Sequence, residues 1–201
     1  MILEYFRRRS LHKRLRLQGA RLYVALAQAA RTPDLYQIYG VPDTVDGRLE
    51  TLMLIAGLGV DRLSRDISDA ALGRELARVV SEAFFDDMDR TFREMGIKDI
   101  GVPRKVRTIS KGFYGRMKSY VEALHKGDEN EFATALRRNF FAEEAVIPAE
   151  FERLPPKVRL FYADLLRLPL DQLMADVPIL PMSLSQHTEF EIEEFINVPH
   201  P

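Results

Sequence analysis

The chain of 201 residues contains no cysteine and no tryptophan. Without cysteine it can form no disulfide framework, thiol nucleophile or cysteine-ligated zinc or iron–sulfur site. Long hydrophobic runs are also missing, since the most apolar stretch, 52–60, is far shorter than the ~20 residues of a membrane-spanning helix. We therefore expect 52–60 to be a buried core helix. Opposite charges nearly cancel to a net charge of -1, which argues against bulk attraction to DNA.

Signals for catalysis are equally scarce. The four histidines are isolated from one another and lack the spacing of metal ligands, and no glycine-rich phosphate loop or nucleophile elbow is present. We predict a protein without catalytic residues, cofactor or metal. One alternative stays open, an all-α, magnesium-dependent prenyl-diphosphate enzyme that uses Asp86, Asp87 and Asp89. Against it, the cation Arg90 stands where such a motif needs another carboxylate.

Apolar residues recur every three or four positions along most of the chain, the spacing of one helix face. This pattern predicts an all-α fold, a single compact domain of about six to eight helices. We divide the chain into a basic amphipathic N-terminal arm (1–21), a helical core (22–144) and a proline-rich, partly irregular C-terminal extension (145–201). The extension contains one expected helix, 157–167, and ends in an acidic tail.

The N-terminal arm has a strong excess of basic residues, because Glu4 is its single acid. Three interpretations compete for it. It is the start of a helix with solvated charges, a surface anchor for anionic lipid, or a contact for ribosomal RNA phosphates. A mitochondrial import sequence has a similar composition, but Glu4 and the lack of an obvious cleavage site weaken that interpretation.

Two expected antiparallel helices, 70–95 and 103–126, form the centre of the sequence. On the first helix, Asp87 falls inside the apolar arc, where an unpaired carboxylate would cost several kcal/mol. We therefore predict a structural ion pair between Asp87 and a basic partner, either Arg48 or Arg116.

The second of these helices carries a stripe of small residues opposite its apolar face. Glycine inside a helix costs about 1 kcal/mol relative to alanine, so two glycines on one stripe call for a close approach by another element. That element is either another helix of this chain or an apolar helix of a client protein. The candidate binding residues are the stripe and its basic flanks: Lys105, Thr108, Lys111, Gly112, Gly115, Arg116 and Ser119.

Two segments, Tyr36 to Leu52 and Phe84 to Leu124, resemble the ubiquinol–cytochrome c chaperone family. The most specific matches are Phe-Asp-Asp-Met-Asp-Arg from residue 85 and Phe-Tyr-Gly-Arg from residue 113. The resemblance covers roughly 22–141. It implies an all-α assembly factor of the respiratory cytochrome bc complex (complex III), without cofactors, that binds newly made cytochrome b.

The same resemblance suggests partners and a location. Mitochondrial relatives work with a small partner chaperone near the ribosomal exit, and peripheral contact with an anionic membrane fits the basic arm. Without a convincing import sequence, we expect a bacterial protein at the cytoplasmic face of the inner membrane. A eukaryotic member would act on the matrix side of the mitochondrial inner membrane.

Overall fold

The computed structural model describes residues 2–96, 101–141, 146–178 and 180, with the side chains of 2–12 left out. Within these ranges the regular structure is entirely helical, as the sequence predicts. None of these described helices is both long and apolar enough to cross a membrane. The main helices are α1 (Ile2–Ala29), α3 (Val45–Ser64), α4 (Ala70–Glu94), α5 (Val102–Lys126), α6 (Glu129–Phe140) and α7 (Leu154–Arg167). The shorter ones are α2 (Pro33–Gln37), the 3-10 helix η1 (Ala149–Arg153) and α8 (Leu170–Leu173).

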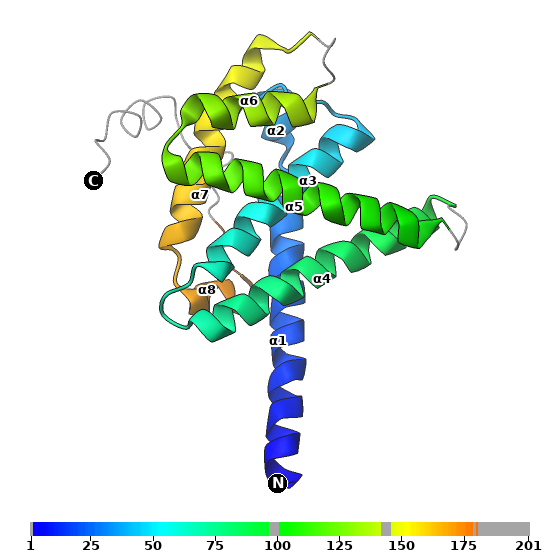
Figure 1. Ribbon diagram of the computed structural model, residues 1–201, viewed down its shortest axis with the longest axis vertical. Helices are drawn as coiled ribbons and strands as arrows, with labels where there is room; N and C mark the ends of the chain where they lie inside the picture. Colours follow the sequence, from blue (N-terminus) through cyan, green and yellow to red (C-terminus); the bar gives the residue numbers. More distant parts are fainter. Residues whose placement is uncertain (1, 97–100, 142–145, 179, 181–201) are drawn as a thin grey trace.

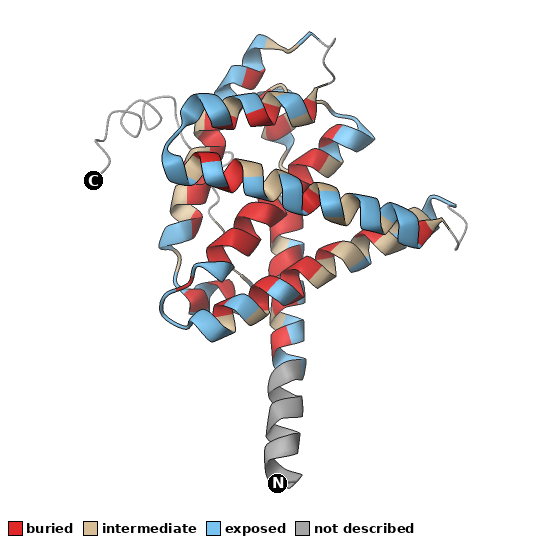
Figure 2. Ribbon diagram, viewed as in Figure 1, coloured by how far each residue is buried: buried red, intermediate tan, exposed pale blue. Residues whose placement is uncertain are grey.

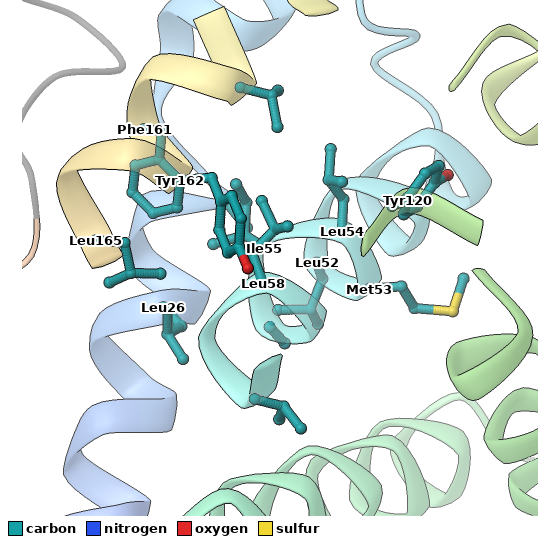
Figure 3. Close-up of a cluster of buried hydrophobic side chains, with 14 of the residues drawn as sticks. Leu26, Leu52, Met53, Leu54, Ile55, Leu58, Tyr120, Phe161, Tyr162 and Leu165 are labelled. Carbon is teal, nitrogen blue, oxygen red and sulfur yellow. The ribbon is translucent and has the colours of Figure 1, made fainter. Parts of the chain in front are cut away.

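The hydrophobic core is built around α3, which α1, α4 and α5 contact on different sides (Figure 1). Every residue from Glu50 to Leu63 is buried, which confirms the expectation for 52–60. Close approach to α1 depends on Gly59, because a Cβ atom there would lie 2.6 Å from a methyl carbon of Leu26. Figure 3 shows Leu26, Ile55 and the aromatic residues of α7 meeting in this cluster.

Local signals in the sequence place several helix ends. Thr44 caps α3 by accepting a hydrogen bond from the backbone N–H of Gly47. The side chain of Asp128 caps α6 by accepting a hydrogen bond from the backbone N–H of Glu131. Gly127 ends α5 with a φ of 68°, the left-handed conformation that glycine adopts without strain. Helices α4 and α5 lie close to the two central helices expected at 70–95 and 103–126.

Part of the proline-rich extension packs into the core. Phe161 and Leu165 of α7 are fully buried, and Arg62 of α3 donates hydrogen bonds to the carbonyl oxygens of Leu165 (3.1 Å) and Leu168 (2.6 Å). The same guanidinium pairs with buried Asp66 at 2.8 Å. Helix α7 thus belongs to the same core as α3, beyond the division made at residue 145. The acidic tail lies outside the described residues.

Helix α1 runs without a break through the division made at residue 21. Its N-terminal half extends away from the other helices (Figure 1), and its contact with the core begins near Leu15. At Gly19, a Cβ atom would come within 2.5 Å of Val79 on α4, so the two helices pack closely there. Figure 2 shows the change from exposed to buried residues along this helix.

Asp87 has a different partner from the one predicted. It is half-buried, and its carboxylate accepts a 2.6 Å hydrogen bond from the hydroxyl of Tyr23 on α1. Burial, followed by this bond to Asp87, raises the pKa of Tyr23. Arg48 and Arg116 pair with other carboxylates, so the predicted ion pair with Asp87 is wrong. A neutral donor stabilises this carboxylate where we expected a cation.

Candidate functional site

Helix α5 presents different side chains to three sides. Its apolar side, with Phe113 and Tyr120, is buried against α3, α4 and α6. Its opposite side is exposed along much of its length (Figure 2). The small-residue stripe, which the sequence placed opposite the apolar face, runs between these two sides along one edge of α5.

No other described helix covers the glycines of the stripe. A Cβ atom at Gly115 would meet no atom within 4 Å, and one at Gly112 would meet only the side chain of Arg116 on the same helix. Ser119 accepts a long hydrogen bond, 3.3 Å, from Arg138 of α6. The first of the two interpretations, a helix of this chain packed on the stripe, is therefore wrong for Gly112 and Gly115 as far as the described helices go. The alternative, a partner from outside the chain, stays open.

One side of the stripe opens into a cavity of about 590 Å³ between α5, the start of α3 and the end of α6. Thr108, Gly112 and Arg116 form the α5 wall. The start of α3 and the end of α6 supply the facing wall, which includes Asp46, Leu49, Glu50, Met53, Asn139 and Phe141.

A second cavity of about 380 Å³ lies beyond the start of α3, on the side of α4. Lys105 of α5 lines it, together with apolar residues from four helices, among them Ala27, Tyr36, Val45, Leu52, Met88 and Met95. Asp46 and Leu49 line both cavities, so both adjoin the first turns of α3.

We call the two cavities together the α3–α5 groove. Its α5 wall runs from Lys105 to Arg116, eleven residues along the helix or about 17 Å at 1.5 Å per residue. Three turns of a partner helix have a similar length. Of the seven candidate residues, Lys105, Thr108, Gly112 and Arg116 line the groove. Lys111, Gly115 and Ser119 do not.

The end of the groove near α6 is polar. Arg116 pairs with Glu50 at 2.6 Å, and the Glu50 side chain is only 10% exposed. Burial raises the pKa of Glu50, while the neighbouring Arg116 acts in the opposite direction. Asn139 is held by a 2.9 Å hydrogen bond to the hydroxyl of Tyr120. These side chains satisfy one another, so this end provides a fixed polar boundary.

The end near α4 is accessible and mainly apolar, although the charged residues Arg31, Arg48 and Asp87 also line it. Val45 is 70% exposed and Met95 is 60% exposed, although both are hydrophobic. The ammonium group of Lys105 lies 5.5 Å from the centre of the Phe92 ring, which places a cation at the rim. Methionine side chains adapt to irregular partners, and Met88 and Met95 both line this end. The chemistry suits apolar side chains of another protein.

The three aspartates of the enzyme alternative do not converge. Asp87 faces Tyr23, Asp89 pairs with Arg93 at 2.6 Å, and Asp86 is exposed. Among the residues that the structure describes, no group of three or more histidine or acidic side chains is arranged to hold a metal ion. Nothing in this arrangement favours magnesium chemistry.

The predicted binding residues include four that line the groove from α5 and none from the wall that faces it. Glu50 and Met53 belong to α3, about 60 positions before their neighbours on α5, and Asn139 belongs to α6. A conspicuous signal was available for the apolar end. Val45 and Met95 lie inside the two segments of the family resemblance, and each is a hydrophobic residue at the end of a helix.

A family model described as ubiquinol–cytochrome C chaperone matches residues 37–180. The chain belongs to the ubiquinol–cytochrome c chaperone family. The match confirms the resemblance seen in the sequence, and it includes α7, α8 and the groove residues of α3, α4, α5 and α6, but not those of α1 and α2. Assembly chaperones are not a class of enzyme.

Related proteins agree with this assignment. The crystal structure of the Cbp3 homolog from Brucella abortus is 34% identical, with a TM-score of 0.75, over 92% of this chain and 99% of that one. Ubiquinol–cytochrome c reductase complex assembly factor 1 from Mus musculus is 20% identical over 146 residues, 73% of this chain. The Xenopus laevis counterpart is equally similar, and 71% of its length is covered. The chain spans about half the length of the mouse protein, 48%.

Proposed function

We propose that this protein is an assembly chaperone of the cytochrome bc complex that holds newly made cytochrome b in the α3–α5 groove. The observation that carries the proposal is an open groove, uncovered at Gly112 by any other described helix, in a member of this chaperone family. Its α5 wall is long enough for about three helical turns.

The groove suits an apolar helix that has not yet found its final neighbours. Apolar side chains of the client would bury surface against Met88, Phe92 and Met95, at about 25 cal/mol for each Å² removed from water. At the other end, the Glu50–Arg116 pair would exclude further apolar surface, because its charges would have to lose their remaining hydration. Binding a client helix in this way depends on the shape and polarity of the groove and requires no reactive group.

Location and further partners follow from the same proposal. We place the protein at the cytoplasmic face of a bacterial inner membrane, where cytochrome b is inserted, and the similarity to a Brucella abortus protein supports a bacterial setting. A small partner chaperone and the ribosome are additional candidate partners, by analogy with mitochondrial members of the family.

The test is capture of cytochrome b during its synthesis. Cells that produce a tagged form of the protein are pulse-labelled and crosslinked, and the tagged protein is purified from solubilised membranes. We expect labelled cytochrome b to co-purify early and to disappear during a chase as the bc complex matures. Normal complex maturation in cells that lack the protein would overturn the proposal.

A further inference from the structure

The outer side of α5 carries an exposed row of cations. Arg104, Arg107, Lys111 and Lys118 are all exposed, and at 3.6 residues per turn they fall within an arc of about 60°. The row is about 21 Å long, since fourteen residues separate its ends. It is distinct from the groove, which Lys105, Thr108, Gly112 and Arg116 line along the neighbouring edge of the helix.

Acidic residues do little to neutralise this row. Helix α5 contains no aspartate or glutamate before Glu122, which lies near Lys118 at 3.7 Å. Within the described residues, Arg104, Arg107 and Lys111 form no ion pair with an acid. The net charge of the whole chain is only -1, so this concentration of positive charge is local and acts within a Debye length, about 8 Å in physiological salt.

The shape of the row favours a flat anionic partner. Side chains along one side of a straight helix can contact a plane together, and each basic residue near an anionic bilayer adds to the attraction. Tyr114 is 45% exposed beside the row, and tyrosine is a residue that favours the membrane interface. Single-stranded RNA is usually bound on several stacked aromatic rings, whereas this side of α5 offers one.

We propose that the outer side of α5, with Arg104, Arg107 and Lys111 at its centre, docks on anionic lipid headgroups. Because the groove lies on the adjacent edge of α5, docking would hold the groove beside the bilayer. This names the membrane contact of the proposed chaperone, and it can be tested without cytochrome b.

The experiment measures binding of the full-length purified protein to vesicles by co-sedimentation. Vesicles of phosphatidylcholine alone are compared with vesicles of equal parts phosphatidylcholine and phosphatidylglycerol. We expect binding to the anionic vesicles only, with loss of binding at high salt. The triple variant Arg104→Gln, Arg107→Gln and Lys111→Gln should bind about 100-fold more weakly, since it lacks three cations that act together.

Two control variants lose the same amount of charge elsewhere. The first replaces Arg74, Arg90 and Arg167, exposed residues on α4 and α7, by glutamine and should bind like the wild type. The second replaces Lys13, Arg14 and Arg16 on α1, the rival basic surface. All three variants should melt within a few degrees of the wild type, because the replaced side chains are exposed.

Each outcome decides for or against the proposal. Selective loss of vesicle binding in the α5 variant supports it. Wild-type protein that ignores anionic vesicles, equal losses in all three variants, or loss only in the α1 variant would overturn it. So would an α5 variant that keeps its binding to anionic vesicles. Cytochrome b capture by the α5 variant is measured separately, so failure here leaves the groove proposal intact.

Discussion

The substitutions Gly112→Leu and Gly115→Leu should differ in their effect on cytochrome b capture. Both glycines lie inside α5, three residues apart, and both belong to the small-residue stripe. A side chain at 112 enters the α3–α5 groove, whereas a side chain at 115 points into open space. The pair therefore separates occupation of the groove from any general effect of removing a helical glycine.

The expected stabilities follow from the surroundings of each residue. Replacing glycine by leucine in a helix interior gains about 0.8 kcal/mol from helix propensity, and Gly115→Leu should realise this gain in full. At Gly112, the new Cβ would lie 2.7 Å from a guanidinium nitrogen of Arg116, so the flexible end of this side chain must shift, and the shift disturbs its pair with Glu50. Weakening that largely buried pair costs about 1 to 3 kcal/mol, so Gly112→Leu should be between neutral and about 2 kcal/mol less stable.

The assay combines urea denaturation with capture of pulse-labelled cytochrome b. Gly115→Leu should melt slightly higher than the wild type and capture cytochrome b normally. Gly112→Leu should remain folded and lose most of the capture. Equal capture by the two variants would refute the assignment of the groove. If the denaturation curve shows that Gly112→Leu is unfolded, the milder variant Gly112→Val is tested in its place.

Three further predictions concern the fold. Tyr23→Phe removes the hydrogen bond to the Asp87 carboxylate and should lower the free energy of unfolding by about 2 kcal/mol in urea titrations; an unchanged midpoint would contradict this role. Burial alone would raise the pKa of Asp66, but its hydrogen bonds outweigh burial and lower the pKa to about 2. The ionised carboxylate therefore stabilises the folded protein by about 2 kcal/mol above pH 4, and this contribution is lost as the pH falls toward 2. Denaturation of Asp66→Asn should be correspondingly less sensitive to pH in that range. Gly47→Ala should lower the melting temperature by several degrees, because the new Cβ would lie 2.0 Å from the Pro42 carbonyl oxygen.

Much of the fold was predictable because helix periodicity and capping are local. Asp128, Gly127 and Thr44 act within a few residues of their own positions, and they place the ends of α3, α5 and α6 close to where the sequence suggests. Burial of 52–60 followed in the same way from its apolar composition.

The partner of Asp87 shows where such reasoning stops. A helical projection correctly turned this carboxylate toward the body of the protein, but it cannot tell which distant side chain meets it there. Tyr23 lies 64 positions earlier, on α1, and its hydroxyl supplies the donor. We expected a cation because a buried charge is commonly paired with one. Asp87 is only half-buried, so a neutral hydrogen-bond donor is enough to stabilise its carboxylate.

The groove was half predictable for a similar reason. Gly112 and Thr108 share a helix, so their common side is visible in the sequence, as are their basic neighbours. Asp46 and Leu49, which line both cavities, come from the first turns of α3, and only tertiary packing brings them opposite α5. Spacing within α5 also could not distinguish the groove edge from the open side that holds Gly115.

Site-specific photo-crosslinking tests the central claim most directly. A benzophenone amino acid is placed at Thr108 or Met95 in the groove, and at Ile67, a residue outside the groove that is 99% exposed. During synthesis of cytochrome b, the groove holds the client, so crosslinks to it should form from Thr108 and Met95 and be absent from Ile67. Crosslinks of equal strength from Ile67, or none from either groove position, would contradict the account.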